Sequence, residues 1–107
     1  MTISSSQGHK VSVIIPAWNE EATVGGIIHA LHSLFQSLPV SVIVVDDASH
    51  DQTRQVGLEN RAVVISLAKH LGAWGAIQTG LRYALQKGAQ VMVTMDADGQ
   101  HEPASLD

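Results

Sequence analysis

Hydrophobic residues follow two different periods along this chain, and segments of the two kinds alternate. Short, nearly continuous apolar runs rich in Val and Ile predict β-strands that are buried on both faces, as in a parallel sheet. Longer segments repeat apolar residues every three or four positions, which predicts amphipathic helices. Strands are expected at residues 11–16, 40–47, 62–67 and 91–95. Helices are expected at residues 19–38, from residue 49 onward, and at residues 72–88.

Local signals place the expected helix ends. Asn19 is the predicted N-cap of the first helix, with Glu20 and Glu21 in its first turn. The sequence "SHDQ" at residues 49–52 has the form of a capping box for the second helix, and Gly88 is the predicted C-terminal cap of the third. The apolar residues of that third helix are expected to share one face: Trp74, Ile77, Leu81 and Leu85.

The alternation of strands and helices predicts an α/β domain with a mainly parallel, four-stranded sheet flanked by helices. Ligands of such sheets bind beyond the carboxyl ends of the strands. Polar residues gather at three of those ends, in "PAWNE", "DDAS" and "DADGQ". Residues 1–10 are expected to be a flexible N-terminus, and residues 11–107 the front part of a longer domain.

Composition narrows the class of protein. The 107 residues suit one small domain, and 45% hydrophobic and 15% charged residues indicate a folded one. The net charge of -4 and the scattered basic residues argue against nucleic acid as the main partner. There is no cysteine, which excludes disulfides and thiolate metal sites. The first ten residues lack the apolar core of a secretory signal, and no apolar run approaches the roughly 20 residues of a membrane span, so a cytoplasmic location is expected.

Asp96 and Asp98 follow the fourth predicted strand and can face the same side of an extended chain. Two carboxylates this close repel each other unless a cation lies between them, and Mg²⁺ or Mn²⁺ suits such hard oxygen ligands. Asp-x-Asp alone is equally typical of strand-end caps and turns. Asp46 and Asp47, which end the second predicted strand, also allow a functional and a structural interpretation. Asp47 could accept hydrogen bonds from a base or ribose while Asp46 braces a turn. Alternatively, both side chains could solvate the turn.

Four blocks taken in order are more specific than any one of them. These are "VSVIIPAWNEE", "VIVVDDASHDQT", "GAWGAIQTG" and "VMVTMDADGQHEP". Together they resemble the family 2 glycosyltransferases, which have the Rossmann-like GT-A fold, and within them most of all the polyprenyl-phosphate sugar transferases. The resemblance extends from Val11 to Pro103 and implies that this is the nucleotide-sugar-binding part of such a domain.

The resemblance implies a role for each matched position. Pro16, Trp18 and Glu20 would line the nucleotide pocket, with Trp18 against the base. Val45 and Asp47 would meet the base and ribose. The ribose, diphosphate and a Mg²⁺ or Mn²⁺ ion would be held by Asp96, Ala97 and Asp98, with Gln100 joining the metal shell. His101 and Pro103 belong to the same signature without a ligand role.

The chain departs from the family pattern before its glycine turn. The family usually has Asn there, often after Arg, whereas this chain has Lys69 and His70. Lys69 could still reach a phosphate of the donor.

The implied reaction is transfer of a sugar from a nucleoside-diphosphate sugar to an acceptor such as a polyprenyl phosphate, in the cytoplasm or at the cytoplasmic face of a membrane. The acceptor site and any general base are expected beyond Asp107, so no catalytic residue is assigned, and this chain alone is expected to be inactive. The sheet edge where the missing half would pack is expected to favour self-association.

Other classes of protein fit the residues less well. A receiver-type signalling domain also binds Mg²⁺ through paired aspartates, but its acidic strand comes first in the chain. A haloacid-dehalogenase-type phosphatase likewise carries Asp-x-Asp on its first strand, and an EF-hand loop would need Gly where His101 stands. His29 and His32 lie off the apolar helix face without a third ligand, so a solvated face is favoured over a zinc site.

Overall fold

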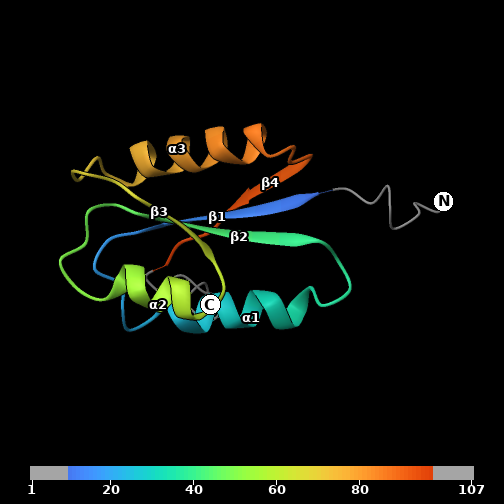
Figure 1. Cartoon of the computed structure of the whole chain (residues 1–107), viewed down its shortest axis with the longest axis horizontal. Coiled ribbons are helices and arrows are strands. Elements are labelled where there is room, and N and C mark those ends of the chain that lie inside the picture. The colour runs from blue at the N-terminus through green and yellow to red at the C-terminus, as the bar shows by residue number, and fades with distance from the viewer. Residues whose placement is uncertain (1–9, 98–107) are drawn as a thin grey trace, which may run out of the picture.

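The seven predicted elements form in the predicted order (Figure 1). The computed structural model describes residues 10–97. Its strands are β1 (Val11–Ala17), β2 (Val40–Asp46), β3 (Val63–Ser66) and β4 (Val91–Thr94). Its helices are α1 (Val24–Leu34), α2 (Thr53–Glu59) and α3 (Ala73–Gln86). Several expectations fall outside the described residues: the flexible N-terminus up to residue 9, Asp98, Gln100, His101 and Pro103.

The four strands form one parallel sheet in the order β3-β2-β1-β4. Val11 at the start of β1 is in register with Val40 of β2 and Val91 of β4. Strands β2 and β3 follow β1 on one side of it, whereas β4 pairs with the other side of β1. Because crossovers between parallel strands are right-handed, this reversal puts α3 on the opposite face of the sheet from α1 and α2 (Figure 1).

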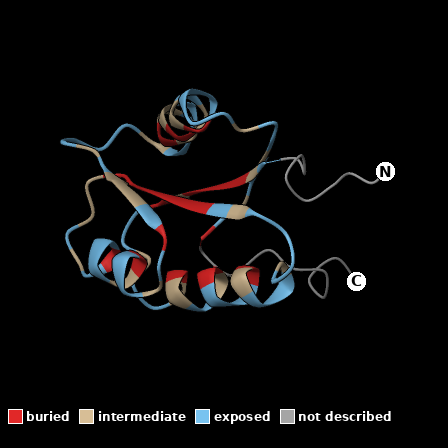
Figure 2. Cartoon of the chain, turned by 45° about the vertical axis from the view of Figure 1, so that its right-hand side comes forward, coloured by how far each residue is buried: buried red, intermediate tan, exposed pale blue. Residues whose placement is uncertain are grey.

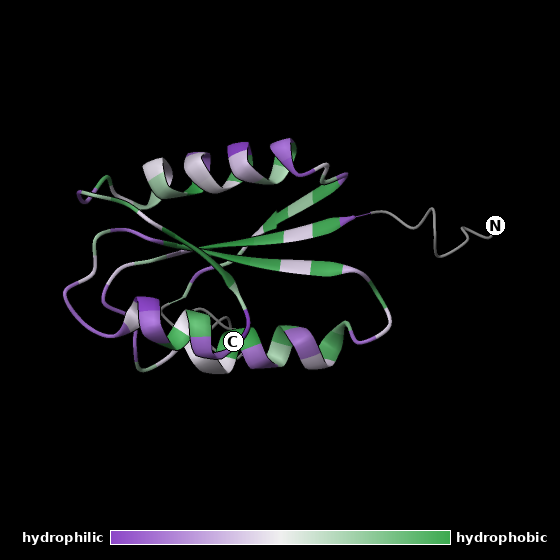
Figure 3. Ribbon diagram, in the orientation of Figure 1, coloured by the Kyte–Doolittle hydropathy of each residue, from purple (hydrophilic) through white to green (hydrophobic). Residues whose placement is uncertain are grey.

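Side chains of the central strands alternate between two cores, one on each face of the sheet. Figure 2 shows buried residues along the central strands and on the helices of both faces. Toward α1 and α2 point Val13, Ile15, Val42 and Val44, and toward α3 point Ile14, Ile43 and Val45. Both faces are covered, so the strands are apolar along nearly their whole length, whereas the helices present polar residues outward (Figure 3). The predicted α/β class with a parallel sheet flanked by helices is confirmed.

The buried face of α3 differs from the prediction. Trp74 and Leu85 are 66% and 60% exposed, and the residues buried against the sheet are Ala76, Gly80 and Ala84. A Cβ atom at Gly80 would lie only 2.6 Å from the Cγ2 atom of Ile14. The helix backbone therefore comes so close to β1 that only small residues fit between them, and the larger apolar residues lie at the flanks or face outward.

The predicted N-cap of α1 is wrong. Asn19 has a φ of 55°, and α1 begins only at Val24. The Asn19 side chain instead accepts a hydrogen bond from the backbone N–H of His50 at 2.8 Å, and its own N–H donates to the Ser49 hydroxyl at 2.9 Å. Asn19 thus connects the loop after β1 to the loop after β2, which no local pattern can indicate.

The other helix ends are partly as predicted. The capping box at residues 49–52 does not form, because the Ser49 hydroxyl bonds to Asn19 and α2 begins at Thr53. The first helix ends at Leu34, four residues before its predicted end. Gly88 is confirmed as the C-terminal cap of α3: its φ is 87°, and its N–H donates to the Leu85 carbonyl at 3.0 Å.

Candidate functional site

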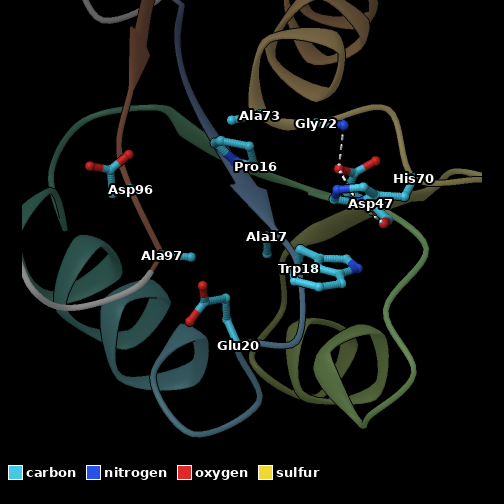
Figure 4. Close-up of a pocket in the computed structure, with 10 residues that line it drawn as sticks. All are labelled: Pro16, Ala17, Trp18, Glu20, Asp47, His70, Gly72, Ala73, Asp96 and Ala97. Carbon is cyan, nitrogen blue, oxygen red and sulfur yellow. Dashed lines mark hydrogen bonds and ion pairs between the residues drawn. The ribbon is translucent and has the colours of Figure 1, made fainter.

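A cavity of about 250 Å³ lies at the carboxyl ends of β1, β2 and β4, where the order of the strands reverses. Its walls are Pro16, Ala17, Trp18, Glu20, Asp47, His70, Gly72, Ala73, Asp96 and Ala97. Figure 4 shows Trp18, Asp47 and His70 on one side and Asp96 and Ala97 on the other, with Pro16 and Ala17 of β1 between them. The structure therefore brings together six of the predicted binding residues: Pro16, Trp18, Glu20, Asp47, Asp96 and Ala97.

The loop that carries Trp18 and Glu20 is held by the loop before α2. The backbone N–H of Glu20 donates to the hydroxyl of Thr53, which is fully buried, at 2.8 Å. One residue further, Glu21 exchanges hydrogen bonds with that loop: its N–H donates to Asp51, and its carboxylate accepts from the N–H of Gln52 at 2.9 Å. These bonds fix one wall of the cavity to the sheet-end loop beside it.

The pKa of Asp51 is lowered by this arrangement. Burial opposes the shift, but the carboxylate accepts hydrogen bonds from the hydroxyl and N–H of Thr53 and from the N–H of Glu21, and together these favour the charged form. Asp51 therefore helps to order both loops while it remains ionised.

Acidification is expected to remove the contribution of Asp51 to stability. Because the folded-state pKa lies below the ordinary value of 3.8, the contribution is complete above that value and is lost as the pH falls through the folded-state pKa. Asp51→Ala should lower the free energy of unfolding by about 1 kcal/mol or less near neutral pH, since the side chain is partly exposed. Urea denaturation at about pH 6 and about pH 3 should show this difference shrinking in acid. A difference that does not change with pH would contradict the assignment.

Asp47 is a buried carboxylate, 2% exposed, at the end of β2. Its Oδ1 accepts from the backbone N–H of Leu71 at 2.7 Å, and its Oδ2 accepts from that of Gly72 at 2.9 Å. Oδ2 also lies 2.9 Å from Nδ1 of His70. Asp47 thus fixes the loop that leads into α3. Its neighbour Asp46 braces the turn, which was one of the two alternatives for it: Oδ1 accepts from the N–H of Ser49 at 3.1 Å.

His70 lines the cavity, although the sequence predicted no role for it. Its ring lies against Trp18, with the ring centroids 4.7 Å apart and the planes tilted by 43°. Lys69, the residue expected to reach a phosphate, is exposed and is not part of the cavity wall. The one available signal was the departure from the family pattern at this position, but only the folded loop shows which of the two residues turns inward.

Two further predicted positions differ in their surroundings. The side chain of Val45 is fully buried in the core under α3 and is not part of the cavity wall, so its contact with a base or ribose stays a prediction. Asp98 and Gln100 lie outside the described residues, so Asp96 is the one predicted metal ligand whose position the structure describes.

The donor atoms at the cavity suit a hard divalent cation. Within residues 10–97 there is no cluster of three or more His, Cys, Asp or Glu side chains that could hold a metal by itself. Mg²⁺ and Mn²⁺ sites that also bind phosphates typically use one or two carboxylates and leave the other positions to phosphate and water. The carboxylate of Asp96 at the cavity fits a site of that kind.

None of the helices in the described part of the chain is long and apolar enough to cross a bilayer.

Comparisons with known proteins identify the family to which the chain is similar. Residues 12–107 match the family described as glycosyl transferase family 2. An undecaprenyl-phosphate mannosyltransferase of Micrococcus luteus is 38% identical over an alignment of 104 positions, which covers 91% of this chain and 41% of that protein. A UDP-N-acetylglucosamine–dolichyl-phosphate N-acetylglucosaminyltransferase of Methanococcus voltae is 33% identical over an alignment of 113 positions, which covers 90% of this chain and 44% of that protein. The chain thus spans less than half the length of these relatives.

Solved structures share the fold. Mannosyl-3-phosphoglycerate synthase from Rubrobacter xylanophilus superposes with a TM-score of 0.75 at 28% identity, over 92% of this chain and 33% of that one. Glucosyl-3-phosphoglycerate synthase from Mycobacterium tuberculosis, in a complex with Mn²⁺ and UDP-glucose, gives a TM-score of 0.68 at 26% identity, over 88% and 35%. These matches support the GT-A fold and leave no support for a receiver-type domain. The chain belongs to glycosyl transferase family 2.

Proposed function

We propose that this chain binds a nucleoside-diphosphate sugar together with a divalent cation. Its residues 11–107 would form the nucleotide-sugar-binding part of a GT-A glycosyltransferase domain. The observation that carries the proposal is the cavity at the strand ends. In it, the aromatic rings of Trp18 and His70 lie on one side of β1 and the carboxylate of Asp96 lies on the other (Figure 4). The described residues suit the two ends of such a donor, a flat base and a charged diphosphate.

Trp18 is the proposed contact for the base. It is 46% exposed and lies against His70, so one side of its ring system is supported while part of it remains open to the cavity. Stacking on an aromatic face supplies affinity for a base with little sequence preference. Asp47 holds the adjoining loop, and we place the ribose next to it, where Pro16 and Glu20 also line the cavity.

The diphosphate and cation are proposed to bind at the opposite wall. Asp96 would hold the metal together with Asp98 and Gln100, and Mn²⁺ or Mg²⁺ there would neutralise charge on the departing diphosphate. In the M. tuberculosis relative, Mn²⁺ and UDP-glucose are bound together, which supports this choice of cation.

The acceptor is proposed to be a polyprenyl phosphate. Curated relatives carry names that specify dolichyl phosphate or undecaprenyl phosphate. Such an acceptor would bring the whole protein to a membrane, and we propose its cytoplasmic face. An acceptor phosphate is already anionic, so attack on the sugar would need little help from a base, and no residue of this chain is assigned that role.

Calorimetric titration tests donor binding. The chain is titrated with UDP, GDP and their sugar conjugates, with and without Mn²⁺. We expect metal-dependent binding of one nucleotide that Asp96→Asn weakens by about tenfold or more. Glu59→Gln is the matched control, because it also removes one carboxylate but lies on the exposed surface of α2. Equal binding by Asp96→Asn, or no binding to either nucleotide by the folded chain, would contradict the proposal.

A further inference from the structure

We propose that Thr23 is a positioning residue for the carboxylate wall of the cavity. Its hydroxyl holds the backbone of Ala97 and thereby sets the direction in which Asp96 meets the donor. This inference rests on the donor-binding function proposed above and assigns a role to a residue that does not line the cavity.

The contact joins two segments that are 74 residues apart in the chain. Thr23 lies directly before α1, and its hydroxyl donates to the carbonyl oxygen of Ala97. Two Glu20 oxygens, the carbonyl and Oε1, are each 3.5 Å from the same hydroxyl. A hydroxyl has one proton to donate, and the Ala97 carbonyl is the nearest of the three acceptors.

The position of Ala97 gives this contact its importance. The last element of the sheet before it is β4, which ends at Thr94, and the N–H of Met95 still donates to the carbonyl of Ile14 at 3.0 Å. Beyond that bond the chain leaves the sheet. Ala97 is then held by burial of its methyl group, which leaves the residue 3% exposed in the core with Val24, and by the hydroxyl of Thr23.

Asp96 lies between the last sheet bond and this anchor. With both ends fixed, the peptide planes on either side of Asp96 cannot rotate freely, so its carboxylate has a defined direction at the cavity. Without the Thr23 hydroxyl, the carbonyl of Ala97 loses its partner in a largely buried position and the segment can turn to find another. Groups that orient a metal-binding side chain typically change metal affinity by 10–100-fold when they are removed.

Two substitutions separate the hydroxyl from the shape of the side chain. Thr23→Val keeps the branched shape and removes the hydroxyl, whereas Thr23→Ser keeps the hydroxyl and removes the methyl group. NMR measures the carbonyl ¹³C shift of Ala97, which reports on this hydrogen bond without any ligand. Titration with Mn²⁺ and the nucleotide that binds the wild-type chain measures the dissociation constant. Chemical denaturation establishes that both variants are folded under these conditions.

In Thr23→Val we expect the Ala97 carbonyl shift to move and the dissociation constant to rise by about tenfold, while Thr23→Ser stays close to wild type in both. An unchanged carbonyl shift in Thr23→Val would overturn the contact. Wild-type affinity in Thr23→Val would overturn the positioning role while leaving donor binding intact. Failure of the wild-type chain to bind would instead overturn the donor-binding proposal and the positioning role with it, and the carbonyl shift would still decide whether the contact exists.

Discussion

Replacing Gly80 by alanine is expected to lower the free energy of unfolding by about 3 kcal/mol. The added methyl group would lie 2.6 Å from Cγ2 of Ile14 and 3.0 Å from Cγ2 of Val45. Both neighbours are fully buried branched side chains on β1 and β2, so neither can move aside without disturbing the core. Helix α3 would have to shift away from the sheet. Urea denaturation of the two proteins measures the loss.

Gly26→Ala is the matched control for this substitution. Gly26 also lies within a helix, but a Cβ atom there would meet nothing within 4 Å. Because alanine has the higher helix propensity, this variant should be more stable than wild type by about 0.5–1 kcal/mol. Equal stability changes in the two variants would mean that helix propensity, and not close packing of α3 on the sheet, decides the effect at Gly80.

Asp47→Asn is expected to reduce both stability and nucleotide binding, although the two side chains have nearly the same shape. The carboxylate accepts from the backbone N–H groups of Leu71 and Gly72 with different oxygens. An amide has only one oxygen, so its NH₂ group would face one of these donors. A lost bond to a charged group and an unpaired donor together cost about 2–3 kcal/mol. The loop before α3 would then shift, and we expect nucleotide binding to weaken by about tenfold or more.

The neighbouring aspartate provides the control. Asp46 is also buried, at 5% exposure, but it accepts the N–H of Ser49 with a single oxygen. Asn can keep that bond, so Asp46→Asn should cost less than about 1 kcal/mol and leave nucleotide binding unchanged. Urea denaturation and calorimetric titration of both variants make the comparison. If Asp47→Asn were as mild as Asp46→Asn, the two backbone hydrogen bonds would not be what holds this wall of the cavity.

The order and type of the elements could be predicted from the sequence because they depend on local periodicity. Each strand is a short apolar run, and α1 and α3 repeat apolar residues at three- and four-residue steps. Helix α2 was expected from the capping-box sequence before it, and all seven elements formed. The buried face of α3 could not be predicted in this way. A hydrophobic pattern indicates which residues avoid water, whereas the distance between helix and sheet decides which of them fit, and that distance places Gly80 against Ile14 and leaves Trp74 exposed.

The cavity was partly predictable for a related reason. Parallel strands bring their carboxyl ends to one edge of a sheet, so Trp18, Asp47 and Asp96 could be expected to meet there from their positions in the chain. His70 could not, because its direction follows from the Asp47 carboxylate binding the loop around it. Asn19 and Ser49 looked like helix caps in sequence, but each found a partner in the other loop.

By itself, the sequence determined the α/β class, the number of strands and their order along the chain, and the strand ends at which polar groups collect. Each of these depends on residues that are close together in the chain. The tertiary structure decided which face of α3 is buried, which loop residues hold one another, and that Thr23 reaches Ala97. These features depend on contacts between residues from about 25 to more than 70 positions apart in the chain. The fold of the whole sheet sets the geometry of such contacts, so a local sequence pattern cannot predict them.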